Sequence, residues 1–259
     1  MKINIVIPFY QSKDTIDALL NSIDDQDYDN FDVTIVFDGP DPRARKQVEE
    51  TYFNANGQCK TRYNLYLEDL PFNQGASAAR NFGAKISGEN LMAKNPGEIL
   101  FFIDADCQLY PGILNEIVTQ FEDNPDIDFV YGNYRFEHKE NYISLPFDAY
   151  RLETMNYIST MSPVRRSAFN RVGGFQDADY FQDWSLFYRL AKAGSKGKYI
   201  NEFFFSTEKP TEKSISGTQG LTLSEKSANF RKVHGIKDKT LVVTSWGADY
   251  QALQRAKIL

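Results

Sequence analysis

The stretch EILFFIDADCQLYPG, residues 98–112, constrains the fold of this chain more than any other. Its apolar run, residues 99–103, contains no polar side chain that could face solvent, so a strand formed here is buried on both faces. The run ends in two acids at alternate positions, Asp104 and Asp106. Such a strand is typical of a parallel sheet covered by helices, with the acids at the carboxyl edge where ligands bind.

The rest of the chain alternates between strand and helix patterns. Apolar runs predict strands at residues 3–8, 32–37, 62–68, 98–103, 128–136 and 195–206. Helical spacing predicts helices at residues 12–26, 75–87, 111–122 and 183–194, with Ser12 as the N-cap of the first. Beyond these, we expect a polar loop at 207–220, a helix at 222–233, a strand at 240–245 and a final helix. The sequence therefore predicts an α/β fold.

Composition limits the class of protein. The 259 residues are 42% hydrophobic and 25% charged, and no stretch approaches the ~20 apolar residues of a membrane helix. The two cysteines, Cys59 and Cys107, form neither a metal spacing nor a disulfide framework, which favours a reducing compartment. We therefore expect a cytoplasmic protein, free or at the periphery of a membrane.

Charge is unevenly distributed along the chain. The net charge is -6, yet residues 184–239 contain eleven Lys or Arg against five acids. The acidic front of the chain argues against general binding to nucleic acid. The basic stretch leaves room for a ligand that carries phosphate.

The acids at the sheet edge call for a counterion. Two neighbouring carboxylates stay ionised when a cation lies beside them, and carboxylate oxygens suit Mg²⁺ or Mn²⁺. Asp38 follows the second predicted strand, and Gly75 and Arg80 open the helix after the third. A guanidinium and a helix N-terminus both favour phosphate. This edge therefore predicts a site for a metal and a phosphate-bearing ligand.

The ordered series VIPFYQ, FDG, NQGASAARNFGAK, FFIDADC and VGGFQDADYFQDWSLFYRLAKAG resembles the family 2 glycosyltransferases, over roughly residues 3 to 194. The resemblance implies the GT-A fold, a Rossmann-like αβα sandwich with a mostly parallel central sheet, here with a C-terminal α/β extension. It implies a catalytic domain at 1–205, with a nucleotide-sugar-binding half at 1–110 and an acceptor-binding half at 111–205. Residues 206–259 would form a loop and a small extension packed on that domain.

The resemblance also implies an activity. Similar enzymes move a sugar with inversion from a nucleotide-diphosphate donor, often a UDP-sugar, to an acceptor hydroxyl, with help from Mn²⁺ or Mg²⁺. The expected partner is thus a nucleotide sugar. The acceptor stays open between a saccharide, a lipid-linked glycan and, as a weaker hypothesis, a nucleic acid. A homo-oligomer is also left open.

The same resemblance assigns roles to individual residues. The donor and nucleotide site would comprise Pro8, Tyr10, Asp38, Gly75, Arg80, Asp104, Ala105 and Asp106. Asp106 would bind the metal, with Asp104 and His234 as further candidates, and Lys209 and Lys213 could neutralise the diphosphate instead. Asp183 would be the general base. Gly174, Tyr180, Gln182 and Trp184 would lie near the acceptor and sugar, with Gln182 in place of the usual Glu.

Two other functions compete with this one. A nucleotidyltransferase would need a glycine-rich phosphate loop after the first strand, and PFYQSKD contains no glycine. A binding or scaffolding module that kept the fold without catalysis is favoured by Gln182 and by the lack of a His in residues 206–217. Against it stand the four acids Asp38, Asp104, Asp106 and Asp183.

Overall fold

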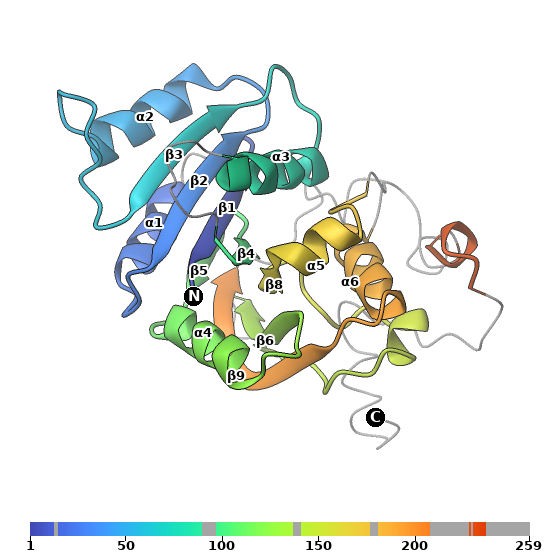
Figure 1. Cartoon of the computed structure of the whole chain (residues 1–259). Helices are drawn as coiled ribbons and strands as arrows, with labels where there is room; N and C mark the ends of the chain where they lie inside the picture. The colour runs from blue at the N-terminus through green and yellow to red at the C-terminus, as the bar shows by residue number, and fades with distance from the viewer. Residues whose placement is uncertain are drawn as a thin grey trace.

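The fold is known from a computed structural model, which describes residues 1–12, 15–89, 97–136, 141–176, 181–207, 228 and 230–236. Within these residues, nine strands form one sheet with helices on both faces (Figure 1). The strands are β1 Ile3–Phe9, β2 Phe31–Phe37, β3 Asn64–Asp69, β4 Ile99–Phe102, β5 Cys107–Leu109, β6 Phe129–Phe136, β7 Asn141–Tyr142, β8 Val164–Arg165 and β9 Gly197–Thr207. The helices are α1 Ile16–Asp24, α2 Pro42–Tyr52, α3 Ala76–Glu89, α4 Ile113–Asp123, α5 Arg166–Arg171 and α6 Gln182–Lys192, with a 3₁₀ turn, η1, at Arg151–Glu153.

The strand order is β3-β2-β1-β4-β8-β6-β9-β5, with β7 beside β6. The first four strands run parallel, so their carboxyl ends share one edge of the sheet. β6 and β9 are also parallel, whereas β8 runs antiparallel to β4 and β6, and β5 antiparallel to β9. The expected α/β architecture is confirmed. The acids that the sequence places after strands lie at the carboxyl edge of its parallel half.

The sheet separates two apolar clusters, as two-sided burial of its strands requires. Ile5 and Ile7 of β1 pack in the cluster that includes α1, α2 and α4. The residue between them, Val6, joins the opposite cluster, which includes α5 and α6. On that second face α3 crosses β1 and β2 (Figure 1). Each fully buried aliphatic side chain contributes about 1.5–3 kcal/mol, so both faces of β1 stabilise the fold.

Helix α1 confirms the predicted apolar face but not its cap. Its buried residues are Ile16, Leu19, Leu20 and Ile23, the positions that helical spacing selected. The predicted N-cap, Ser12, is wrong: the residue before the helix is Thr15. The Ser12 hydroxyl donates back to the Tyr10 carbonyl at 2.9 Å, so it is engaged in the preceding turn.

The predicted C-terminal extension lies almost wholly outside the described residues. β9 continues to Thr207, two residues past the predicted end of the catalytic domain at 205, and its last residues pair with β5 and β6. Of the helix predicted at 222–233, residues 228 and 230–233 are described and helical. The division of the chain into domains stays a prediction.

Candidate active site at the carboxyl edge of the sheet

The parallel strands β3, β2, β1 and β4 end at one edge of the sheet, and predicted donor residues follow three of these ends. Tyr10 comes directly after β1, and Asp38 directly after β2. Asp104 and Asp106 lie between β4 and β5, in a turn where the Cys107 amide donates to the Asp104 carbonyl at 3.0 Å. Parallel pairing thus gathers side chains that are distant in the chain.

The buried carboxylate of Asp38 holds the loop that enters α3. One oxygen accepts the Gln74 amide at 2.6 Å, and the other accepts the Gly75 amide at 2.9 Å. Two amide donors satisfy a buried carboxylate that would otherwise be costly. The structure therefore brings the predicted residues Asp38 and Gly75 into contact, and this contact fixes the start of α3 against β2.

Arg80, on α3, joins the acidic edge of the sheet to the start of α6. Its Nη2 donates to Asp104 Oδ1 at 2.5 Å, and its Nη1 donates to Gln182 Oε1 at 2.9 Å. The guanidinium carbon lies 5.5 Å from the centre of the Phe175 ring. Arg80 is only 5% exposed, and a planar fork of donors in such a setting orients both partners. The bond to Gln182 thereby fixes α3 beside the start of α6, although the two residues are 102 positions apart in the chain.

Asp104 and Asp106 are the candidate metal ligands. Asp106 is exposed, and the Asp104 side chain is 36% exposed although one of its oxygens pairs with Arg80. Among the residues that the structure describes, no three His, Cys, Asp or Glu side chains gather as a metal cage. Mg²⁺ is commonly held by one or two carboxylates together with substrate phosphates. The donor set therefore fits a divalent ion that arrives with a diphosphate.

Asp183, the predicted base, lies in the first turn of α6. Its Oδ1 accepts the Trp184 amide at 2.8 Å. Burial raises the pKa of Asp183 above its ordinary value, while Asn156, the Trp184 amide and the charge of Arg80 oppose that rise. A carboxylate with a raised pKa accepts a proton more readily than a solvated one, which suits a general base.

The residue before α6 has an unusual backbone. Phe181 has φ of 57°, the left-handed region that bulky side chains rarely adopt, at a cost of about 1–2 kcal/mol. Its ring meets the Trp184 ring at 5.3 Å, nearly edge-on. Packing therefore maintains a strained entry into the helix that carries Asp183, a pattern common at functional sites.

The predicted glycine turn is held by the side chains of Asn81 and Arg189. Asn81 Nδ2 donates to the Phe175 carbonyl at 2.7 Å, and Asn81 Oδ1 accepts the Phe175 amide at 2.9 Å. Arg189 donates to the Gly174 carbonyl at 2.7 Å. The turn is thus fixed between α3 and α6, next to Arg80. The motif NQGASAARNFGAK contains Asn81, but its partner lies 94 residues away and no local spacing reveals it.

Other predicted residues fall at different depths. Pro8 lies within β1, Tyr10 is 53% exposed, and Ala105 is buried in the acidic turn. Trp184 is 1% exposed, its Nε1 donates to the Leu152 carbonyl at 2.6 Å, and its ring stacks on Phe230. Its predicted contact with sugar or acceptor is therefore not supported, because the ring packs in the core.

His234 is the remaining metal candidate that the structure describes. The His234 ring packs against Tyr188 of α6 and against Phe230. Burial, followed by the charge of Arg189, lowers the pKa of His234. These contacts favour a packing role over the predicted metal ligation. Tyr180, Lys209 and Lys213 lie outside the described residues.

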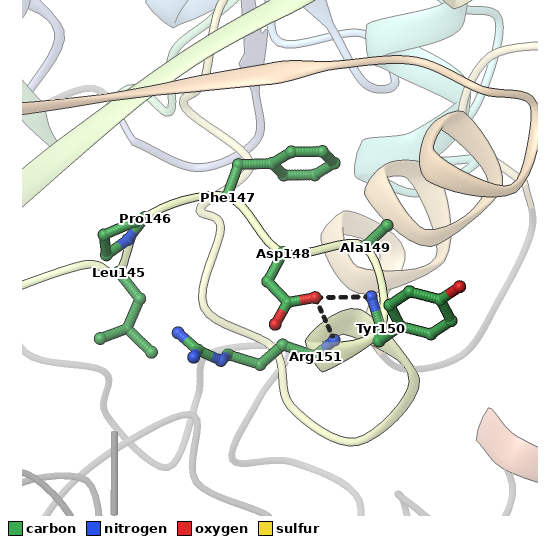
Figure 2. Close-up of a pocket in the computed structure, with 7 residues that line it drawn as sticks. All are labelled: Leu145, Pro146, Phe147, Asp148, Ala149, Tyr150 and Arg151. Atoms are coloured by element: carbon green, nitrogen blue, oxygen red, sulfur yellow. Dashed lines mark hydrogen bonds between the residues drawn. The ribbon is translucent and has the colours of Figure 1, made fainter. Parts of the chain in front are cut away.

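An open cavity of about 970 Å³ lies beside η1, lined by the loop at 145–151 (Figure 2). Within the loop, Asp148 Oδ1 accepts the backbone amides of Tyr150, at 2.9 Å, and of the next residue, at 3.3 Å. The Tyr150 side chain is 79% exposed. The bond between Trp184 and the Leu152 carbonyl ties η1, which follows this loop, to the helix of the predicted base.

Comparison with known proteins agrees with this geometry. The model of the family described as Glycosyl transferase family 2 matches residues 4–189. An uncharacterized glycosyltransferase of Haemophilus influenzae is 26% identical over 91% of this chain and 77% of its own length. The chain belongs to the family 2 glycosyltransferases, which confirms the expected class of enzyme.

Solved structures share the fold. TarS 1-349 of S. aureus, in complex with UDP-GlcNAc, superposes with a TM-score of 0.71 at 17% identity, over 91% of this chain and 66% of that one. The mannosyltransferase PcManGT of Pyrobaculum calidifontis, with GDP-Man and Mn²⁺, gives 0.61 at 17% identity, over 99% of this chain and 68% of that one. The GT-A fold is thus confirmed. In the described part of the chain, none of the helices has the length and apolar character needed to cross a membrane.

Proposed function

We propose that this protein transfers a sugar, with inversion, from a nucleotide-diphosphate donor to an acceptor hydroxyl. The observation that carries the proposal is the Arg80 bridge, because it joins the acidic edge at Asp104 to the helix that bears Asp183. A transferase needs this proximity, since the donor diphosphate and the attacking hydroxyl meet at one carbon atom. Family membership supports the reaction class.

The donor would lie along the carboxyl edge of the sheet. Pro8 and Tyr10 would flank the nucleoside. Asp38 would fix the position of the loop that enters α3, beneath the nucleoside. Asp106, with Asp104, would hold Mn²⁺ or Mg²⁺, which when bound stabilises the negative charge that builds on the leaving diphosphate. The UDP-GlcNAc bound by TarS supports a UDP-sugar as donor, and the Mn²⁺ in PcManGT supports the metal.

Asp183 would act on the acceptor. Its carboxylate takes the proton of the acceptor hydroxyl while that oxygen forms a bond to the anomeric carbon. The bond between this carbon and the diphosphate oxygen breaks on the opposite face, and the electron pair leaves with the nucleoside diphosphate. Attack opposite to the leaving group inverts the anomeric centre. The raised pKa of Asp183 supports this role.

The cavity beside η1 is the proposed entrance for the acceptor. Its loop, residues 145–151, leads into η1, which is hydrogen-bonded to the first turn of α6, and presents an exposed tyrosine ring. Aromatic faces and hydrogen-bonding side chains suit a saccharide. We therefore favour a saccharide or a lipid-linked glycan over a nucleic acid.

The test separates binding from turnover. For Asp183→Asn, we expect turnover of a UDP-sugar to fall at least about 100-fold, because the base contributes that much. The thermal shift produced by UDP with Mn²⁺ should persist in this variant and disappear in Asp106→Ala. Asp123→Asn, an exposed acid on α4, is the matched control and should change neither measurement.

Two outcomes contradict the proposal. Full turnover by Asp183→Asn would remove the base from this residue. A wild-type protein that shows no shift with any nucleoside diphosphate and metal would favour the scaffolding alternative.

A further inference from the structure

Phe72 is a large apolar side chain that the fold leaves in solvent. It is 64% exposed, and its ring joins none of the apolar clusters formed by the described residues. It lies in the loop between β3 and α3, directly before the motif NQGASAARNFGAK. A single exposed apolar side chain is common on protein surfaces, so its position decides whether it has a function.

The backbone on both sides of Phe72 is held in place. Before it, the Leu70 amide donates to the Phe37 carbonyl of β2 at 2.9 Å. After it, the carboxylate of Asp38 accepts the Gly75 amide at 2.9 Å. The loop therefore presents the ring of Phe72 from a fixed backbone, so a ligand that packs on the ring need not first order the loop.

Gly39 brings the backbone of Phe72 close to the end of β2. A Cβ on Gly39 would lie 3.3 Å from the carbonyl carbon of Phe72 and 3.0 Å from the amide nitrogen of Asn73. Gly39 has φ of 91°, a left-handed value that favours glycine. The loop that carries Phe72 thus packs directly against the residue after Asp38, at the carboxyl end of β2.

Tyr10 is a second exposed aromatic side chain at the same edge. It follows β1, on the other side of β2 from β3, and is 53% exposed. Its hydroxyl accepts a hydrogen bond from Gln11 Nε2 at 3.2 Å, and its carbonyl accepts one from Ser12 Oγ at 2.9 Å. Gln11 has φ of 54°, a left-handed value that residues other than glycine rarely adopt. A strained turn therefore holds Tyr10, as is common at functional sites.

The strand order leaves room for one flat ring between Phe72 and Tyr10. The two residues follow β3 and β1, which flank the strand that ends before Asp38. Two strand spacings put the ends of β1 and β3 about 9–10 Å apart. A planar ring held on both faces needs walls about 7–8 Å apart, twice the usual contact between carbon atoms. The ends of these strands are thus far enough apart for such a ligand.

The direction of the donor along the sheet edge favours a nucleobase as this flat ring. The candidate metal ligands Asp104 and Asp106 follow β4, the last of the four parallel strands, and the Arg80 bridge fixes the start of α6 beside them. A nucleoside diphosphate whose phosphates lie at β4 therefore has the carboxyl ends of β1, β2 and β3 on its other side. A nucleobase is flat, and bases of every kind stack on aromatic side chains.

We propose that Phe72 is a donor-binding residue: its ring packs on one face of the donor nucleobase, and Tyr10 packs on the opposite face. This inference rests on the proposed function, since it concerns the nucleotide of the same donor. Phe72 contributes affinity for the base, whereas Asp104 and Asp106 contribute affinity for the diphosphate and its metal ion.

The test compares a ligand that has a base with one that has none. The first is whichever of UDP, GDP, ADP, CDP and dTDP binds the wild type most tightly with Mn²⁺, and the second is inorganic pyrophosphate with Mn²⁺. In isothermal titration calorimetry, Phe72→Ala should weaken binding of the nucleotide by about 5-fold to 150-fold, the usual effect of removing one stacking ring. Its affinity for pyrophosphate should equal that of the wild type. Phe72→Trp keeps an aromatic face and should bind the nucleotide about as tightly as the wild type.

Two further measurements separate stacking from a structural role. Val233→Ala shortens an apolar side chain that is 75% exposed, on the helical turn at 230–233, and should change neither affinity. In Phe72→Trp, the nucleotide should quench the fluorescence of the introduced indole and pyrophosphate should not, because only a stacked base changes the surroundings of that ring. Titration of the wild type gives the contribution of its two native tryptophans.

Three outcomes would overturn the proposal. The first is an equal affinity of the wild type and Phe72→Ala for the nucleotide. The second is a parallel loss of affinity for pyrophosphate, because Phe72 would then only shape the loop. The third is an indole that the nucleotide does not quench.

The same titrations distinguish this inference from the proposed function. A wild type that binds the nucleotide but transfers no sugar would contradict the proposed function, while the comparison of the two ligands would still decide the role of Phe72. A wild type that binds none of the five nucleotides would overturn both.

Discussion

At the scale of single residues, the acids of the site differ by what each carboxylate already binds. Both oxygens of Asp38 are taken by backbone amides, one oxygen of Asp104 is taken by Arg80, and Asp106 is exposed. Asp183 is desolvated at the start of α6, where its Oδ1 accepts the Trp184 amide. These differences separate an anchoring acid, two acids at an accessible edge and a basic carboxylate, although all four have the same side chain.

Asp183 should lower the stability of the protein at neutral pH. Its pKa is raised in the folded state, so the folded chain binds more protons than the unfolded chain between the ordinary carboxyl value and the raised one. The free energy of unfolding therefore falls as pH rises through this window. Asp183→Asn cannot ionise and should be more stable than the wild type at pH 7.5, with the gain vanishing below about pH 4.

Urea unfolding at pH 7.5 and at pH 3.5 measures this difference. A gain in stability of equal size at both pH values would show that packing, rather than ionisation, explains the effect of Asp183→Asn. A loss at pH 7.5 would contradict the direction of the pKa shift.

At the scale of elements, the sequence predicted the parts with strong apolar periodicity. β1, β2, β4, α1, α4 and α6 form close to their predicted places because their burial patterns follow one face or both faces of an element. α2 was missed because only Ala44 and Val48 of its residues are buried, which leaves no periodic apolar face. β5, β8 and α5 were missed because they are two to six residues long and depend on tertiary contacts.

The candidate site also combines residues that could be predicted from the sequence with contacts that could not. Acids that follow strands could be predicted, because strand ends are visible in the sequence and parallel pairing brings them together. The contact of Asn81 with Phe175 could not, because it depends on how a distant loop folds back on the sheet. The burial of Trp184 could not be predicted either, because the exposure of an aromatic residue cannot be inferred from its place beside a candidate base.

The glycine turn at 173–174 offers a matched pair of substitutions. Both glycines have positive φ, 77° and 70°, so either change to Ala costs about 1–2 kcal/mol in backbone strain. A Cβ on Gly173 meets nothing within 4 Å, whereas a Cβ on Gly174 would lie 2.6 Å from Asn81 Oδ1. We expect Gly174→Ala to destabilise the protein by about 1–3 kcal/mol more than Gly173→Ala, since it also breaks the buried contact of Asn81 with Phe175.

Chemical denaturation of the two variants tests this expectation. Equal losses in the free energy of unfolding would mean that strain alone matters in the turn. That result would remove Asn81 as the element that fixes it.

At the scale of the whole molecule, Arg166 connects the two predicted halves of the catalytic domain. From the start of α5 it donates to the carbonyls of Ala84 and Gly97 and to Asn4 Oδ1, at 2.5, 2.7 and 2.6 Å. Burial lowers its pKa to about 10, so the guanidinium is still protonated at neutral pH. Together with the continuous sheet, this cluster predicts that residues 1–205 unfold as one cooperative unit.

Arg166→Lys should shift the urea midpoint downward, with a loss of about 2 kcal/mol, because an ammonium group cannot serve three acceptors in the geometry of the fork. Arg171→Lys, on the same helix but with its side chain 45% exposed, is the matched control and should lose less than about 1 kcal/mol. Tryptophan fluorescence and far-UV circular dichroism should give coincident transitions. Two separate transitions in the wild type would instead support independent halves.

The bridge made by Arg80 has a consequence for the timing of the reaction. The Arg80 guanidinium donates both to Asp104, at the sheet edge, and to Gln182, at the start of the helix that carries Asp183. When an arriving ligand draws Asp104 toward itself, the cation loses part of its counter-charge and is felt more strongly at Asp183. The pKa of Asp183 would then be lower in the occupied enzyme than in the empty one, so that donor binding, before the acceptor reacts, widens the pH range in which this carboxylate is ionised.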